Sequence, residues 1–349
     1  MRKTAVVICP GRGTYTKTEL GYLKDRRAHA PDLIAGIDRA LAALGEPTVT
    51  ALDGAAVFSL RTHTPGEFAS TLIYACSAAD FHAIDREQID IVAITGNSMG
   101  WYTTLALGQA LDEVAAFSLI HQMGSMMKAG IIGGQLIYPI VGPDWRLDPE
   151  RASLVERVLG EVNQRPGCEA HLSIRFGGYI IVGANAAALA LLMQLLPSID
   201  DGKYPFVLVN HAAFHTPMLR GISERGLSLL GPELFHAPQI PLIDGRGVIW
   251  QPYSTDPDEL RAYTLGPQVY EPYDFSKAVE VALKEFAPDL LILLGPGATS
   301  GGAIGQILIQ QQWLGLTSKD AFAKRQEQTP VLLAMGRVDQ ARLVTKPAQ

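Results

Sequence analysis

A serine flanked by two glycines is the residue best suited to chemistry in this sequence. Ser98 lies in Gly96-Asn-Ser-Met-Gly100, between the apolar run Ile89–Ile94 and an alanine- and leucine-rich stretch. This order predicts a strand, a sharp turn and a helix, and a Gly-x-Ser-x-Gly turn holds the serine hydroxyl clear of the backbone. Backbone N–H groups at the start of the helix can then face a developing oxyanion. We predict that Ser98 is a nucleophile; the alternative is a plain strand-to-helix turn, because the five-residue pattern also occurs by chance.

A serine nucleophile needs a general base, and the sequence contains eight histidines. Two of them, His211 and His215, follow the strand-like run 206–209, where a chain usually leaves the rim of a sheet. His215 precedes Thr-Pro, which fixes a turn and opens a helix, so its ring should be held in place. We therefore favour His215 over His211. No acid-bearing strand end is evident between the serine and the histidine, so a dyad oriented by a backbone carbonyl fits better than a triad.

The bulk composition is that of an ordinary globular protein. The 349 residues are 48% hydrophobic and 18% charged, and a net charge of −6 argues against binding to nucleic acid or to an anionic membrane. The three cysteines are far apart, and neither an HExxH pattern nor a carboxylate cluster occurs, so we expect no metal site. No signal peptide or membrane-spanning run is evident. We expect a soluble, cytoplasmic protein, with a monomer as the default.

The order of the expected elements predicts an α/β fold. Residues 130–210 follow a β-α-β-β-α-β order, which is typical of a ferredoxin-like subdomain. The flanks, 1–129 and 211–349, alternate strands and helices in the manner of a parallel sheet. We predict a hydrolase-like parallel-sheet core that carries the serine and the histidine, with a small ferredoxin-like subdomain inserted at 130–210. Residues after Lys319 are charged and poorly patterned, and we expect them to form a surface tail.

Four motifs resemble the landmarks of one protein family. Cys9-Pro-Gly-Arg-Gly-Thr-Tyr15 resembles the Phe-Pro-Gly-Gln-Gly-Ser-Gln start of the malonyl-CoA:acyl carrier protein transacylases and of polyketide synthase acyltransferase domains. The serine motif is similar to their Gly-His-Ser-Leu-Gly turn. Ala213-Phe-His-Thr-Pro-Met218 looks like their histidine motif, and Leu294-Gly-Pro-Gly297 like their late glycine loop. The motifs occur in the family's order and together span about 290 residues.

The resemblance implies an acyltransferase of fatty acid or polyketide biosynthesis. Ser98 would attack the thioester of an acyl-CoA with His215 as general base, and the phosphopantetheine thiol of an acyl carrier protein would then accept the acyl group. Acyl-CoA is a substrate here, and no cofactor is implied. The oxyanion would lie between the backbone N–H groups of Met99 and Arg12. The loop at Asp244-Gly245 would supply the carbonyl that orients the histidine.

The sequence departs from the family where malonyl-selective members bind the free carboxylate of their substrate. Those members use an arginine in a helix soon after the serine; Met123 occupies that position here, and Asn97 replaces the histidine of the serine motif. Burying an unpaired carboxylate against a methionine would cost on the order of several kcal/mol. Either the acyl group is uncharged, which we favour, or Arg12 or Arg175 replaces the missing arginine from another wall. We place Asn97, Met123, Phe214 and Arg175 in the substrate pocket.

Two other functions remain open. A thioester hydrolase with the same nucleophile fits, because acyl-serine hydrolases of this family would also lack the carboxylate-binding arginine. A scaffold that binds a carrier protein without turnover belongs to a different class, and the intact Ser98 and His215 argue against it.

Overall fold

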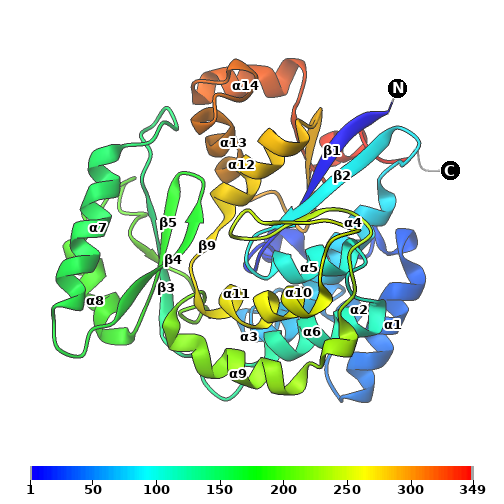
Figure 1. Cartoon of the computed structure of the whole chain (residues 1–349), viewed down its shortest axis with the longest axis horizontal. Coiled ribbons are helices and arrows are strands. Elements are labelled where there is room, and N and C mark those ends of the chain that lie inside the picture. The colour runs from blue at the N-terminus through cyan, green and yellow to red at the C-terminus, as the bar shows by residue number, and fades with distance from the viewer. Residues whose placement is uncertain (1, 347–349) are drawn as a thin grey trace.

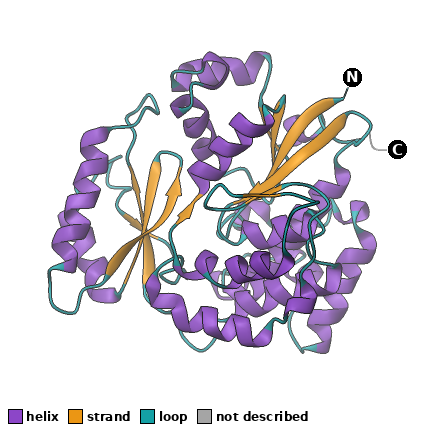
Figure 2. Cartoon of the chain, in the orientation of Figure 1, coloured by secondary structure: helices purple, strands orange, loops and turns teal. Residues whose placement is uncertain are grey.

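Two β-sheets form the framework of the molecule, and helices pack around both (Figures 1 and 2). The computed structural model describes residues 2–346. The larger sheet contains the N-terminal strand β1 (Lys3–Cys9), and the smaller sheet lies beside it, with helices α7 (Pro149–Asn163) and α8 (Ala186–Leu195) on its outer side (Figure 1). Within the described residues, no helix combines the length and the apolar character needed to cross a lipid bilayer.

The larger sheet is mostly parallel. Among the described residues its strand order is β11-β10-β1-β2-β7-β8, with β7 and β8 antiparallel and the other neighbours parallel. The interior of β1 and the whole of β10 are buried, as expected for parallel strands that are covered on both faces. The prediction of a parallel-sheet core is confirmed. Beside β1, the strands are β2 (Ile89–Gly96), β7 (Leu242–Ile243), β8 (Ile249–Trp250), β10 (Leu290–Leu293) and β11 (Leu332–Ala334).

Parallel pairing brings three of the sequence motifs to one edge of this sheet. Ile8 of β1 is in register with Thr95 of β2 and with Leu293 of β10. The loops that follow these strands therefore emerge side by side, although they are far apart in the sequence. Such an edge, at the carboxyl ends of parallel strands, is where open α/β sheets bind their ligands.

Helix α4 (Gly66–Ala83) runs through the middle of the core. Nearly all of its residues are buried, and it packs against α5 and α6 as well as α1. A helix that is buried all round presents no single apolar stripe. The other core helices are α1 (Pro31–Ala43), α2 (Val49–Asp53), α3 (Leu60–His63), α5 (Gly100–Leu107), α6 (Glu113–Ser125), α9 (Arg220–Leu229), α10 (Pro257–Leu265), α11 (Pro267–Tyr270), α12 (Phe275–Phe286), α13 (Gly301–Gln310), α14 (Lys319–Gln328) and α15 (Val338–Ala341).

The smaller sheet has the predicted ferredoxin-like arrangement. The chain runs β3-α7-β4-β5-α8-β6, and the strands lie in the order β6-β3-β5-β4 with antiparallel neighbours. A fifth strand, β9, comes from outside residues 130–210 and pairs in parallel with β4. The exact limits of the inserted subdomain remain a prediction. The strands are β3 (Gly134–Pro139), β4 (Ala170–Phe176), β5 (Tyr179–Ala184), β6 (Phe206–Val207) and β9 (Tyr273–Asp274).

The hairpin between β4 and β5 packs closely against helix α13. Gly177 in its turn has φ of 61°, and a Cβ atom there would lie 2.4 Å from the carbonyl oxygen of Ala303. Both facts favour glycine at this position. The turn thus fixes the smaller sheet to the core.

The prediction of a surface tail after Lys319 is wrong. This segment supplies β11, which pairs in parallel with β10 and forms an edge of the larger sheet. Leu332 and Leu333 are at most 4% exposed. The strand has three residues inside a charged region, which is too short to produce a recognisable apolar pattern.

A pair of leucine substitutions tests the structural role of this segment. We expect Leu333→Ala to lower the free energy of unfolding by about 2–5 kcal/mol, because a buried side chain is lost. Leu343→Ala, at a position that is 58% exposed, should change it by less than about 0.5 kcal/mol. Urea unfolding of both variants measures the two values. If both variants changed the free energy of unfolding by the same small amount, the segment would not be part of the hydrophobic core.

Candidate active site

Ser98 lies at a sharp turn between strand β2 and helix α5. Its φ of 55° is unfavourable for a residue with a side chain, and such strain persists mainly where the surrounding structure enforces it. A Cβ atom on Gly96 would lie 2.4 Å from the backbone of Gly100, and one on Gly100 would lie 2.4 Å from the carbonyl oxygen of Cys9. Both glycines are therefore needed for the chain to turn this tightly beside β1. The strand, turn and helix match the order predicted from the sequence.

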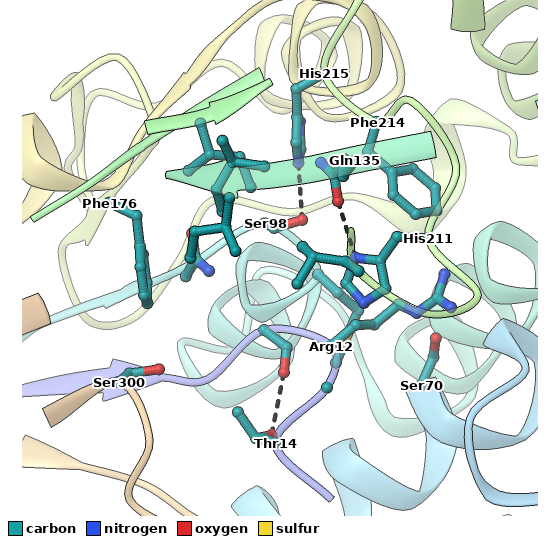
Figure 3. A pocket seen from close by; sticks show the side chains of 18 of the residues that line it. Arg12, Thr14, Ser70, Ser98, Gln135, Phe176, His211, Phe214, His215 and Ser300 are labelled. Atoms are coloured by element: carbon teal, nitrogen blue, oxygen red, sulfur yellow. Dashed lines mark hydrogen bonds between the residues drawn. The ribbon is translucent and has the colours of Figure 1, made fainter. Parts of the chain in front are cut away.

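Ser98 and His215 are hydrogen-bonded to each other (Figure 3). The Ser98 Oγ atom is 2.7 Å from His215 Nε2, and His215 Nδ1 is 2.6 Å from the carbonyl oxygen of Gln268. A carbonyl only accepts hydrogen bonds, so Nδ1 carries the proton and Nε2 is free to accept one from the serine. His211, the other histidine considered, has its ring directed at Gln135 instead.

Burial keeps His215 neutral. It lowers the pKa of the ring from 6.5 to about 4, although the hydrogen bond to the Gln268 carbonyl acts in the opposite direction. At neutral pH the ring is therefore an unprotonated base in contact with the serine hydroxyl. This arrangement can take a proton from the serine as it attacks an electrophile.

The predicted role of the Asp244-Gly245 loop is wrong, because the carbonyl that binds the histidine belongs to Gln268. The Asp244 carboxylate accepts hydrogen bonds from its own loop, which turns back into strand β8. A Cβ atom on Gly245 would lie 2.5 Å from the Tyr273 ring, whose centroid is 5.3 Å from that of the histidine. The loop thus packs against the Tyr273 ring, and that ring packs in turn against His215.

Gln268 connects both members of the pair, and the sequence analysis missed it. Its side-chain amide donates to the carbonyl oxygen of Ser98 at 3.2 Å and accepts from the Tyr102 hydroxyl at 3.0 Å. It is 3% exposed. The preceding Gly-Pro indicates the start of a helix. Nothing local in the sequence indicates which carbonyl will meet a histidine 53 residues away.

The loop after strand β1 lies against the serine turn. The Asn97 N–H donates to the Cys9 carbonyl at 3.0 Å, and a Cβ atom on Gly11 would lie 2.8 Å from the Asn97 carbonyl oxygen. Within residues 2–346, the backbone N–H groups of Arg12 and Met99 donate to no other protein atom. Both residues line the same cavity as the serine. Their predicted role as oxyanion donors fits this placement and remains a prediction.

The cavity beside the pair has a volume of about 460 Å³ and lies between the two sheets. Asn97, Met123 and Phe214 line it, as predicted, and so does Arg12. Its walls are largely apolar and include Ile137, Ile174, Phe176, Ile181, Leu219 and Ile222. Within the described residues, no group of three or more histidine, cysteine, aspartate or glutamate side chains is placed to hold a metal ion.

Arg175 was predicted to line this cavity, and the structure places it elsewhere. Its neighbours on strand β4, Ile174 and Phe176, face the cavity, and side chains alternate between the faces of a strand. The Arg175 guanidinium is half exposed, with its Nε atom 3.7 Å from the Asp274 carboxylate.

Comparison with known proteins agrees with this geometry. The sequence is 24% identical over 336 residues to the malonyl CoA-acyl carrier protein transacylase of Haemophilus influenzae, covering 92% of this chain and 97% of the relative. The structure is similar to that of the malonyl-CoA:acyl carrier protein transacylase of Xanthomonas oryzae pv. oryzae, with a TM-score of 0.73, 18% identity and coverage of 99% and 100% of the two chains. The chain has the transacylase fold. A malonyl-transacylase solved with a type II polyketide synthase acyl carrier protein gives a TM-score of 0.72 at 19% identity, over 97% of this chain and 98% of that one. No protein-family profile matches the sequence.

These findings confirm the resemblance to the transacylases that the four motifs indicated. They also agree with the predicted fold class, a hydrolase-like α/β core with a ferredoxin-like subdomain. Three of the four transacylase-like motifs meet in space, because the first loop, the serine turn and the histidine all line one cavity. Met123 lines this cavity, at the position where the resemblance implies an arginine in malonyl-selective members.

The pKa of His215 predicts how activity depends on pH. Only the neutral ring can act as a base, so the rate of Ser98 acylation should fall as the pH drops through about 4, and not through 6.5. The rate is measured from pH 8 to pH 4 by the mass of the intact protein after brief exposure to an acyl-CoA. A loss of activity centred near pH 6.5 would contradict the buried, neutral histidine.

The same titration needs a control for unfolding. In the unfolded chain this histidine binds a proton at its ordinary pKa, near 6.5, whereas in the folded chain it does not do so until about 4. The free energy of unfolding should therefore decrease as the pH falls through this window. Circular dichroism at each pH separates loss of the fold from loss of the base.

Proposed function

We propose that the protein is an acyltransferase that moves an acyl group from coenzyme A to an acyl carrier protein through an acyl-serine intermediate. The observation that carries this proposal is the 2.7 Å contact between Ser98 Oγ and the neutral His215 Nε2 atom in an apolar cavity. The similarity to transacylases along nearly the whole chain supports it.

The first half-reaction forms the acyl-serine. Ser98 Oγ attacks the thioester carbonyl carbon while His215 Nε2 takes the hydroxyl proton. The negative charge on the tetrahedral intermediate is stabilised by the N–H groups of Met99 and Arg12. The carbonyl oxygen of Gln268 stabilises the protonated ring, which gives its proton to the departing coenzyme A sulfur.

The second half-reaction runs the same steps in reverse with a different thiol. The phosphopantetheine thiol of the carrier protein gives its proton to His215 and attacks the acyl-serine carbonyl. The intermediate collapses, Ser98 recovers its proton and the acyl group leaves on the carrier. One solved transacylase of similar fold is bound to an acyl carrier protein, which supports this choice of acceptor.

The proposal also includes the pathway, the cellular location and the oligomeric state that were expected from the sequence. The protein acts in fatty acid or polyketide biosynthesis in the cytoplasm, as a monomer, on acyl-CoA and acyl carrier protein. A hydrolase with the same intermediate would differ only in the second step, in which water replaces the carrier thiol.

Intact-mass measurement after incubation with acyl-CoAs tests the proposal. The panel contains acetyl-, propionyl-, malonyl- and succinyl-CoA. We expect a mass increase of one acyl group, absent in Ser98→Ala because the nucleophile is gone, and transfer of that group to added carrier protein bearing phosphopantetheine. Ser153→Ala, which changes an exposed serine in helix α7, should still be acylated.

The other outcomes separate the alternatives. Rapid release of free acid without carrier protein would indicate a hydrolase. If none of the four donors gave an adduct or free acid, neither the acyltransferase nor the hydrolase function would hold. A scaffold that binds a carrier protein without turnover would then be the remaining alternative.

A further inference from the structure

The cavity opens to solvent between three loops. Among the described residues that line it, most are buried or half-buried, and the exposed ones are Gly13, Lys203 and Thr299. Gly13 lies in the loop after β1, Lys203 in the turn before β6, and Thr299 in the loop between β10 and α13. A substrate that reaches Ser98 from solvent therefore passes these three loops, and a group at its outer end lies beside them.

Helix α13 begins at this opening with backbone donors that have no partner. Within residues 2–346, the N–H groups of Thr299, Ser300, Gly302 and Ala303 donate to no protein atom. No side chain of the described residues caps this end of the helix, which is 10 residues long. The first N–H groups of a helix carry a partial positive charge, and together they form a site suited to an anion.

The side chain of Ser300 also lacks a partner. The residue is 4% exposed and lines the cavity, and its hydroxyl forms no hydrogen bond with any described residue. Figure 3 shows this hydroxyl directed toward the interior of the cavity. A Cβ atom on Gly302 would meet no atom within 4 Å, so there is open space beside the first turn of the helix. A buried hydroxyl without a partner costs free energy, which a hydrogen bond to a ligand oxygen would offset.

The charges at the opening favour an anion. Lys203 forms no ion pair within the described residues, and its Nζ atom lies 5.1 Å from the centre of the Tyr204 ring. The carboxylate of Glu19 lies beside Gly297 of the loop before α13, and it accepts the N–H of Thr16 at 2.9 Å in a capping box. The opening thus offers a cation and unpaired N–H groups, while the carboxylate beside it is hydrogen-bonded within its own turn.

We propose that the N-terminus of α13, together with the Ser300 hydroxyl, binds the phosphate of the phosphopantetheine arm that coenzyme A and the acyl carrier protein share. This inference rests on the proposed acyltransferase function. The arm has the reacting sulfur at one end and the phosphate at the other, so a phosphate held at the opening directs the sulfur inward, toward Ser98. Because the arm is the same in both substrates, one site serves both half-reactions.

A comparison of phosphopantetheine with pantetheine tests the site, because the two molecules differ only in the phosphate. Both are titrated into the Ser98→Ala protein, in which no covalent step can occur. We expect calorimetry to show that phosphopantetheine binds about a hundredfold more tightly, as expected for one or two hydrogen bonds to a charged group. The ratio of the two dissociation constants should fall as salt is added, because the helix end and Lys203 act through charge.

Three further changes in the same protein sharpen the comparison. Ser300→Ala should reduce the ratio by about tenfold, because the hydroxyl is lost and the backbone donors remain. Ser300→Asp should remove the preference, because its carboxylate occupies the helix end; aspartate is also favourable at the start of a helix, so the fold is kept. Ser153→Ala, the matched control on the exposed face of α7, should leave the ratio unchanged. Circular dichroism of each variant checks the fold.

Steady-state kinetics tests whether both substrates use the site. Ser300→Ala should raise KM for the acyl-CoA and KM for the carrier protein bearing the arm by similar factors, about tenfold each. The value of kcat should change little, because the phosphate is bound equally in the ground state and in the transition state. A rise in KM for the acyl-CoA alone would mean that the site binds a different phosphate of coenzyme A, and it would overturn the shared site.

The inference and the proposed function can fail separately. If no donor acylates Ser98 while phosphopantetheine still binds more tightly than pantetheine, the proposed function fails and the phosphate site stands. If Ser98 is acylated but the two molecules bind equally, or if Ser300→Asp leaves their ratio unchanged, the proposed function stands and the phosphate site is wrong.

Discussion

The hydrogen bond from His215 Nδ1 to the Gln268 carbonyl is the interaction on which the site depends. It fixes the tautomer and the ring orientation, and so it determines that Nε2 faces Ser98. A carbonyl can do this without bringing a second ionisable group into a buried site. The ring therefore remains neutral at rest, and its protonation is favourable only while the serine is losing a proton. The Gln268 side chain ties the same residue to the serine backbone, so one residue positions both partners.

The larger sheet explains how such distant residues come to lie together. Strands β1 and β2 are parallel neighbours, so the first loop and the serine turn leave the sheet at the same edge. Contact between them requires glycine on both sides, at Gly11 and Gly100, where any side chain would meet backbone atoms. The spacing of glycines in the two motifs is thus a consequence of packing one turn on another. It also brings Arg12 and Met99 to the same cavity as the serine, and within residues 2–346 their backbone N–H groups donate to no protein atom.

The features that could be predicted from the sequence are those that local patterns encode. Ser98 stands in a turn with a strict steric requirement, His215 stands before a proline that opens a helix, and the ferredoxin-like order follows from apolar spacing. It did not predict features that depend on which segments meet after folding. The carbonyl of Gln268, the outward direction of Arg175 and the pairing of β11 each depend on contacts across long sequence separations. Met123 does line the cavity, as predicted from the resemblance and from its distance along the chain from the serine turn.

The side chain of Arg12 holds the loop after β1 in place. Its guanidinium donates to the carbonyl oxygens of Thr64 and Asn210, and the preceding residue, Gly11, packs against the backbone of Asn97. The loop is therefore fixed both to the serine turn and to two segments outside it. The proposed oxyanion donor, the backbone N–H of Arg12, thus needs no ordering while negative charge develops on the substrate, which is the condition for stabilising a transition state by preorganised donors.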